Sequence, residues 1–459
     1  MTAALRAVRS PALLAALAAA ETTAAMLAAY RTAPIVPLAG VGAAGTLVLA
    51  YARPLVLVHL AVALIPLELF AVRLGSVGVT VTEALFGLGG LGWGLRRIVD
   101  GHRPWVRHPL NGGLALLLLA VLAGVVVAIE PFAVVRILVM WTLFALVLQL
   151  IVDRAGPQDI RRIIWLLALS GAAVAAVAVV SSGGQAPQLS DLGDTATGRA
   201  VGSFTDPNIL GTFLALALPG ALVLGLTGPV ARRPIALAAA GLILAGLGLS
   251  LSRGGLLAAG GALLVLLAWA PIRRLALLGT AIVIVLAVLN ANPLAGVQQV
   301  DTVVERVISV QYAGQTQFDQ RSEIYRVTPQ IIADHPIVGV GANQYSLVAP
   351  HYGLIDPYTG FTFDHAHDIA LTIGAELGLV GLAGLAWLVV ALAGVLWRAC
   401  VQAPVDRALA ISVTAALVGL SLQGLVDYTV RSNIVAALVA VLAGCGVALS
   451  RPARAAPPG

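Results

Sequence analysis

The chain has 459 residues, of which 59% are hydrophobic and 10% are charged, and its formal net charge is +6. A soluble protein of this size carries roughly a quarter of charged residues, so the composition excludes a soluble globular protein. All the basic residues are arginine, which we attribute to coding bias, and no nucleic-acid partner is expected.

Long unbroken apolar segments follow one another along the chain. Only helices and closed barrels satisfy their backbone polar groups in lipid, and barrel strands are about 10 residues long and alternate in polarity. Segments of about 17–25 apolar residues instead predict an all-α, polytopic transmembrane helix bundle, with about 12–14 spans. The predicted spans lie near residues 11–30, 34–51, 54–72, 78–95, 109–129, 132–151, 163–181, 207–227, 234–251, 254–270, 274–290, 368–397, 407–427 and 432–449.

The first apolar segment follows Arg6 and Arg9 and resembles a signal peptide, but we interpret it as an uncleaved first helix because so many spans follow. Cys400 and Cys445 lie in or beside predicted spans, so no disulfide framework is expected. Four units are predicted: N-terminal helices (1–181), central helices with a short outer loop (182–291), a large extracytoplasmic loop (292–366), and C-terminal helices with a cytoplasmic tail (367–459).

Arginine bias predicts the orientation. If the N-terminus is inside, most arginines fall in short cytoplasmic loops, as the positive-inside rule requires. Both termini are then cytoplasmic, and the loops 181–206 and 292–364 face outward. In the longer loop, residues 300–310 and 322–333 have the spacing of surface helices, and Gly339 and Gly341 allow a turn.

Several arginines break the orientation rule and sit at helix starts that enter from outside. Asp206 and Pro207 predict a capped helix start just after Arg199, and Ser252 can cap the helix that Arg253 opens. Helix N-termini combined with guanidinium groups form a receptor for phosphate or diphosphate. Alternatively, these arginines reach the interface or pair with Asp191, Asp194, Glu323 or Asp427. The exceptions are Arg31, Arg73, Arg136, Arg199, Arg253, Arg306, Arg321, Arg326 and Arg431.

The outer loop closes on Asp364-His365-Ala366-His367-Asp368, directly before a long apolar segment. Ionisable groups at such a boundary are functional candidates. We expect Asp364 to cap the following helix and to orient His367, whose neutral ring would act as a general base. A structural role for either histidine is the alternative. Metal binding is disfavoured, because His365 and His367 are two residues apart and no cysteine is near; no metal or other cofactor is expected.

Taken in order, four motifs resemble the O-antigen ligase and polymerase superfamily of bacterial envelope glycosyltransferases, over roughly Arg199 to Gly444. The first runs from Arg199 to Asn208, and the second is the Ser-Arg-Gly helix start at Arg253. The third runs from Arg321 to Tyr325 and on to Asp334-His335-Pro336 and Gly341. The last is His367-Asp368 followed by Gly378-Leu379-Val380-Gly381. The superfamily usually has an amide after the histidine, where this chain has Asp368.

The resemblance implies a metal-independent transfer of a glycan from an undecaprenyl-diphosphate-linked donor, on the outer face of the bacterial plasma membrane. It implies His367 as the base, with Asp364 and Asp368 as secondary catalytic candidates. It implies Arg199, Arg253 and Arg321 as the diphosphate clamp, with Asn208 and His365 also binding substrate. The implied partners are the lipid-linked oligosaccharide donor, a glycan, lipid or protein acceptor, and the membrane.

Two other functions remain open at this point. A transporter or flippase of lipid-linked sugars would also need outward arginines, but it requires a polar path through both leaflets, and Glu21 and Glu68 are the main charges within the spans. A scaffold of the cell envelope would not need the combination of arginines and histidine.

Overall fold

The computed structural model describes residues 35–68, 71–74, 77–182, 199–269, 273, 318–355, 362–402 and 407–451. Regular structure within these ranges is almost all helical, which confirms the predicted all-α architecture. The expected spans 11–30 and 274–290 and the expected surface helix 300–310 lie outside the described residues.

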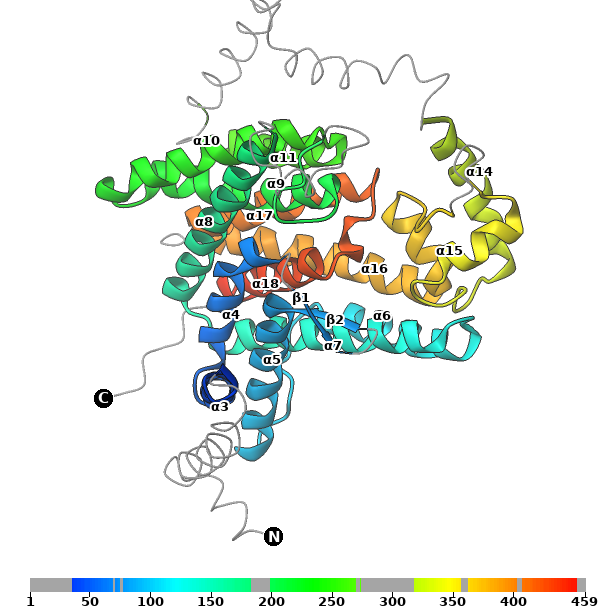
Figure 1. Cartoon of the computed structure of the whole chain (residues 1–459), viewed down its shortest axis with the longest axis horizontal. Coiled ribbons are helices and arrows are strands. Elements are labelled where there is room, and N and C mark those ends of the chain that lie inside the picture. Colours follow the sequence, from blue (N-terminus) through cyan, green and yellow to red (C-terminus); the bar gives the residue numbers. More distant parts are fainter. Residues whose placement is uncertain are drawn as a thin grey trace, which may run out of the picture.

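The helices form one bundle, in which α7, α16 and α18 run roughly along the long axis while α5 and α8 cross it steeply (Figure 1). Their bounds are α3 (Ile35–Ala52), α4 (Pro54–Ala63), α5 (Val81–Val99), α6 (Asn111–Val127), α7 (Pro131–Arg154), α8 (Pro157–Ser182), α9 (Pro207–Thr227), α10 (Arg233–Ser250), α11 (Arg253–Leu267), α14 (Phe318–Asp334), α15 (Tyr345–Val348), α16 (Ile369–Gln402), α17 (Arg407–Gly424) and α18 (Asn433–Leu449). Short 3-10 helices are η1 (Ile65–Leu67), η3 (Val230–Arg232), η5 (Ala349–Tyr352) and η6 (Thr429–Arg431).

Fewer helices than the predicted spans are long and apolar enough to cross a membrane. Within the described residues six qualify (α7, α8, α9, α10 with its preceding turn, α16 and α17), while α6, α11 and α18 are apolar but shorter. Helices α3 and α4 meet at a bend of 119° and count at most as one further span.

The predicted span 54–72 is wrong beyond Ala63. The chain there turns through η1, which contains Pro66, into an antiparallel hairpin of β1 (Ala71–Leu74) and β2 (Val77–Thr80). A proline has no N–H to donate and cannot continue a regular helix, so the apolar composition persists while the helix ends.

Helix α9 lies at the centre of the bundle and packs against α8, α10, α11 and α17. Of an 18-residue apolar segment of this helix, 83% is buried. Close approach to α11 depends on two glycines. A Cβ on Gly211 would lie 2.7 Å from the Cβ of Ser252, and a Cβ on Gly255 would lie 2.8 Å from the backbone of Gly211. The start of α11 is therefore held against the first turns of α9.

Helix α14 confirms the helix predicted at 322–333. It packs with α15 and η5 around a small apolar cluster that includes Ile324, Ile331, Tyr345 and Leu354. Figure 1 shows α14 and α15 at one end of the molecule, which we call the α14 end.

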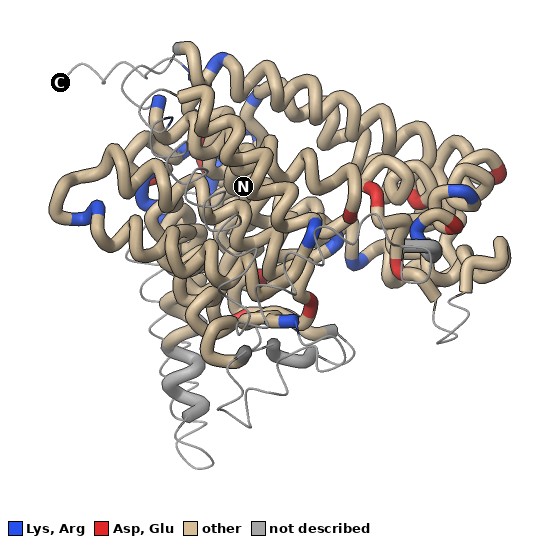
Figure 2. The backbone as a smooth tube through the Cα atoms, turned by 90° about the horizontal axis from the view of Figure 1, so that it is seen from above, with Lys and Arg blue, Asp and Glu red and all other residues tan. Residues whose placement is uncertain are grey.

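Charged residues are concentrated at helix ends and in the connecting segments, and the long stretches of helix between them are almost uncharged (Figure 2). Away from the α14 end, Arg97 forms an ion pair of 3.0 Å with Asp153, and Arg451 donates to the carbonyl oxygens of Arg107 and Val152. Arginines thus tie several chain segments together there.

Helix α16 is broken close to its start, where Gly378 has φ 61° and ψ −159°. The loop after α14 docks into this break. The amides of Val340 and Gly341 donate to the carbonyls of Ala375 and Glu376, each at 2.9 Å. Gly339 and Gly341 both have positive φ, which confirms the predicted turn.

We expect Gly339→Ala to destabilise the protein more than Gly353→Ala. Both glycines have positive φ, but a Cβ on Gly339 would lie 2.3 Å from the backbone carbon of Glu376, while nothing lies within 4 Å of one on Gly353. The backbone conformation costs each variant roughly 1–2 kcal/mol, and overlap adds on the order of 1–3 kcal/mol at Gly339. Thermal unfolding in detergent measures the difference; equal losses would contradict the docking described here.

Candidate active site

A buried carboxylate joins two histidines at the α14 end. Asp427, in the turn between α17 and η6, accepts contacts on one oxygen, Oδ1, from His365 Nε2 at 3.2 Å and from His367 Nδ1 at 3.4 Å. The two imidazole rings lie 4.3 Å apart between centroids. The His365 side chain is 6% exposed, that of Asp427 7%, and that of His367 25%, so His367 is the ring that a substrate can reach.

The backbone around His367 is held in an uncommon conformation. His367 has φ 53°, in the left-handed region, where a non-glycine residue is uncommon and worth attention. Tyr325 of α14 donates from its hydroxyl to the carbonyl oxygen of His367 at 3.2 Å. The Asp368 carboxylate accepts from the amide of Leu371 at 2.8 Å. The sharp turn therefore presents His367 directly before α16 begins.

Asp427 is fixed by its own local bonds. Its backbone amide donates to the carbonyl of Gln423 at 2.9 Å, and its Oδ1 accepts from the amide of Tyr428 at 2.8 Å. Gln423 in turn donates to Thr212 of α9 at 2.6 Å. The carboxylate position is thus tied to the central helix of the bundle.

Burial and hydrogen bonding act in opposite directions on the carboxylate of Asp427. Burial raises its pKa, but the hydrogen bonds from His365 and His367, and the charges of the two rings when they are protonated, outweigh this and hold the pKa well below its usual range. Burial lowers the pKa of His365, against the hydrogen bond to Asp427. An ionised carboxylate facing a buried neutral imidazole is the consistent arrangement.

These contacts define which nitrogen of His367 can accept a proton. An ionised carboxylate only accepts hydrogen bonds, so Nδ1 carries the hydrogen when the ring is neutral. The lone pair is then on Nε2, which Asp427 leaves unused. The geometry is that of an oriented general base.

The predicted clamp arginines lie on three segments: before α9, at the start of α11 and on α14. Arg199 donates to the carbonyl of Ser250 at 3.0 Å and to the Asn208 side chain at 2.8 Å. Arg253 opens α11 after Ser252, whose side chain accepts from the amide of Gly255 and confirms the predicted cap.

Arg321 of α14 lies next to the histidine cluster. It donates to the carbonyl of Val426 at 3.2 Å, one residue before Asp427. Together with Tyr325, four residues further along α14, it connects this helix to both segments that supply the cluster. A cap at Asp206 is also confirmed, since its side chain accepts from the amide of Asn208 at 2.7 Å.

Two expectations about acidic residues need correction. Asp364 does not cap the following helix: α16 begins at Ile369, and Asp368 bonds its first turn. Asp364 is exposed and faces Arg431 at 3.7 Å, and the carboxylate that contacts His367 is Asp427. From the sequence, Asp427 is expected only as a partner for arginine, because spacing cannot show that the turn after α17 reaches the turn before α16.

The same three side chains could hold a metal ion. One ligand atom from each of His365, His367 and Asp427 lies within 4.8 Å of the others. The spacing of the two histidines disfavoured a metal site in the sequence analysis, because the third potential ligand, Asp427, is distant in the chain. The arrangement accommodates either chemistry, and metal independence stays a prediction.

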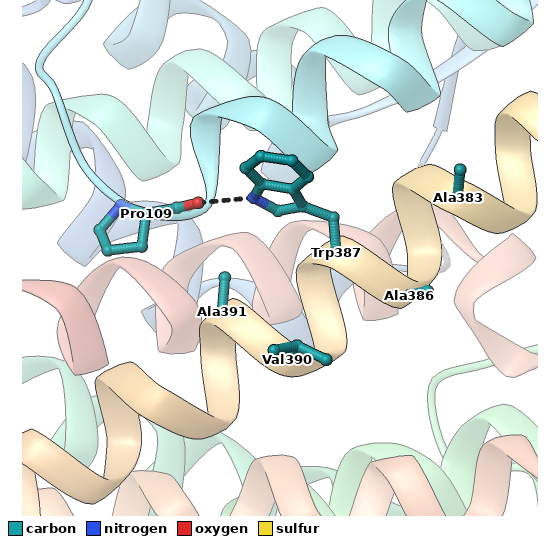
Figure 3. A pocket seen from close by; sticks show the side chains of 6 residues that line it. All are labelled: Pro109, Ala383, Ala386, Trp387, Val390 and Ala391. Carbon is teal, nitrogen blue, oxygen red and sulfur yellow. Dashed lines mark hydrogen bonds between the residues drawn. The ribbon is translucent and has the colours of Figure 1, made fainter.

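A separate, open apolar pocket of about 550 Å³ lies along α16 (Figure 3). It is lined by Pro109, Ala383, Ala386, Trp387, Val390 and Ala391, and Trp387 donates to the carbonyl of Pro109 at 3.0 Å. Trp387 lies nine residues beyond the break of α16 at Gly378, and the histidine cluster lies before the start of the helix. This cavity is not part of the histidine cluster.

Fold and site together define a multi-pass membrane protein with a polar, arginine-bordered histidine site at one end of its helix bundle. Residues 238–386 match the family model described as O-antigen ligase. This match supports the O-antigen ligase superfamily that the motifs predict, and with it a glycan-transfer function in general. No curated protein matches the chain.

The match includes His365, His367, Arg253 and Arg321. Arg199, Asn208, Asp427 and Arg431 lie outside it, on either side. The contacts of His365 and His367 with Asp427 therefore join the matched segment to a residue outside it, and the site extends beyond the match.

We expect Asp427→Asn to lower glycan transfer by about 10²–10⁴-fold, the range that general acid–base catalysis supplies. An amide can present its NH₂ to His367 and favour the tautomer with hydrogen on Nε2. Initial rates with purified protein in detergent measure the effect. Asp334→Asn is the control, because Asp334 is the last residue of α14 and accepts from Tyr352. Equal rates for the two variants would remove Asp427 from the mechanism.

Proposed function

We propose that the protein transfers a glycan from an undecaprenyl-diphosphate-linked donor to an acceptor hydroxyl, at the outer face of the bacterial plasma membrane. The observation that carries the proposal is the contact between His367 and the ionised, buried Asp427, which leaves Nε2 of a partly exposed imidazole available as a base. The O-antigen ligase match supports the same reaction class.

In the proposed reaction, Nε2 of His367 takes the proton of the acceptor hydroxyl. The acceptor oxygen forms a bond to the anomeric carbon of the donor as the bond between that carbon and the diphosphate oxygen breaks. Asp427 stabilises the imidazolium that results. The proton and the electron pair of the broken bond thus leave on His367 and on the diphosphate, respectively.

The proposed diphosphate clamp consists of Arg199, Arg253 and Arg321. The hydrogen bonds of Arg199 to Ser250 and Asn208 hold its guanidinium through neutral acceptors, and so does the bond of Arg321 to Val426. The amides at the starts of α9 and α11 add a partial positive charge. Charge that develops on the leaving diphosphate would be stabilised by groups already in place.

The remaining candidate residues receive supporting places in this proposal. His365 is nearly buried and contacts Asp427, so it positions the carboxylate rather than binding sugar. Asp368 holds the first turn of α16. Both termini are proposed to be cytoplasmic, and the acceptor is a glycan, a lipid or a protein.

We expect His367→Ala to abolish transfer while leaving expression and membrane insertion unchanged, because the variant loses the base. Transfer is followed with purified protein and lipid-linked donor, and His351→Ala, an exposed histidine near the end of η5, is the control. Retained transfer would exclude His367 as the base. Loss of wild-type activity in a chelator, with recovery on adding Zn²⁺, would instead assign the cluster to metal binding.

We expect Arg253→Lys to weaken donor binding, because an ammonium group cannot make the two parallel hydrogen bonds that a guanidinium offers to a diphosphate. The measurement is KM for the donor, with Arg273→Lys as control, since Arg273 donates to the backbone carbonyls of Leu267 and Ala268 at the other end of α11. An unchanged KM would indicate that Arg253 has only a structural role.

A further inference from the structure

Arg431 is a cation at the α14 end that the proposed clamp does not use. It ends η6, four residues after Asp427, and immediately precedes the cap of α18. One of its partners, Asp364, directly precedes His365 in the chain, and the charge of Arg431 adds to the lowering of the pKa of His365, behind burial and the charge of His367. An anion bound to Arg431 would therefore sit beside the histidine cluster.

The two partners of Arg431 are both carboxylates. One terminal nitrogen lies 3.0 Å from Asp206 Oδ2, and the other lies 3.7 Å from Asp364 Oδ2. By contrast, the hydrogen bonds described for Arg199 and Arg321 go to carbonyl and amide oxygens. The charge of Arg431 is thus balanced in this structure by acids of the chain itself.

The two ion pairs differ in strength and in how firmly their acids are held. Asp206 is 25% exposed and also caps α9 through the amide of Asn208. Asp364 is 68% exposed, and its 3.7 Å contact is longer than a hydrogen bond. Exposed pairs of this kind contribute little to stability, so Asp364 is the partner that a competing anion can replace.

Arg431 is also connected to the proposed clamp through the start of α9. Asp206 holds Arg431 through Oδ2 and the amide of Asn208 through Oδ1, and the Asn208 side chain accepts from Arg199. Arg431 and Arg199 are therefore anchored on the same helix turn. A diphosphate bound to Arg199 would lie beside the first turn of α9. Asp206, at the start of the same turn, binds Arg431.

We propose that Arg431 is a further donor-binding residue. Asp364 occupies one terminal nitrogen of its guanidinium group until the donor binds. The diphosphate replaces Asp364 on one side of the guanidinium, while Asp206 retains the other side. Asp364 thus acts as an internal competitor of the donor. The inference rests on the proposed function and adds a regulatory step to the same site.

The test is a double-mutant cycle on binding, in the full-length protein in detergent. The quantity measured is the Kd for undecaprenyl diphosphate in the wild type, Asp364→Asn, Arg431→Gln and the double variant. We expect Asp364→Asn to tighten binding about twofold to fivefold, as loss of an exposed ion-pair competitor allows. We expect Arg431→Gln to weaken binding, and the double variant to equal Arg431→Gln.

Two controls separate this effect from general changes in surface charge. Arg326→Gln removes another exposed arginine, one that pairs with Glu323 on α14, and Asp334→Asn removes another acid near the same end; neither should alter Kd. Asp364 is exposed, so its variant tests the inference even if Arg431→Gln folds poorly. Unchanged or weaker binding in Asp364→Asn, or equal tightening with and without Arg431, would overturn it.

The outcome can be told apart from a failure of the proposed function. The cycle measures binding without turnover, whereas His367→Ala tests the chemistry. Loss of transfer in His367→Ala together with additive effects at Asp364 and Arg431 would reject only the competitor role. If no variant, including Arg253→Lys, binds undecaprenyl diphosphate differently from the wild type, the diphosphate clamp itself is rejected.

Discussion

The carboxylate of Asp427, buried against His365 and His367, is the interaction on which the site depends. A lone buried carboxylate would be costly, and the energy is recovered only when several donors point at it. Here two imidazoles and the amide of Tyr428 converge on the same oxygen. These hydrogen bonds keep the Asp427 carboxylate ionised. The ionised carboxylate in turn determines the tautomer of His367, because it only accepts hydrogen bonds.

Such an arrangement requires that two distant turns be placed accurately against each other. One turn precedes α16 and the other follows α17, and neither is regular structure. Their positions are set by Tyr325 and Arg321 of α14 on one side and by Gln423 bonded to Thr212 on the other. The outer loop is itself fixed by its docking into the break of α16 at Gly378. The motif glycines Gly341 and Gly378 thus affect the site indirectly, because they allow the outer loop to dock against α16.

Much of the fold was accessible from the sequence because apolar length, capping residues and turn glycines are local signals. The caps at Asp206 and Ser252 and the helix at α14 were predicted for that reason. The break between α3 and α4 was likewise expected from the separate spans 34–51 and 54–72. The hairpin after η1 was not, because composition stays apolar where the backbone changes direction.

The site was predictable in part only. Residues within one motif, such as His367 and Asp368, could be grouped by sequence, but their partners could not. Asp427 lies 60 residues after His367, and only packing of α17 against α9 and α16 brings it near. Asp364 was assigned to His367 by proximity in sequence, while the reversed backbone at His367 (φ 53°) directs that ring toward Asp427 instead.

The distribution of charge favours chemistry at one end of the bundle over movement through it. Carrying a charged sugar-phosphate across the membrane requires polar groups along the whole path, because each isolated charge in the hydrocarbon region costs several kcal/mol. In the described helices the arginines and acids instead gather at the ends (Figure 2). At the α14 end, the carbonyl of Ser250 accepts from Arg199 and that of Val426 from Arg321, and these hydrogen bonds orient the two guanidinium groups. In the proposed function these groups bind the diphosphate at the membrane surface, and the neighbouring His367 supplies the base, so the reaction needs no polar path across the bilayer.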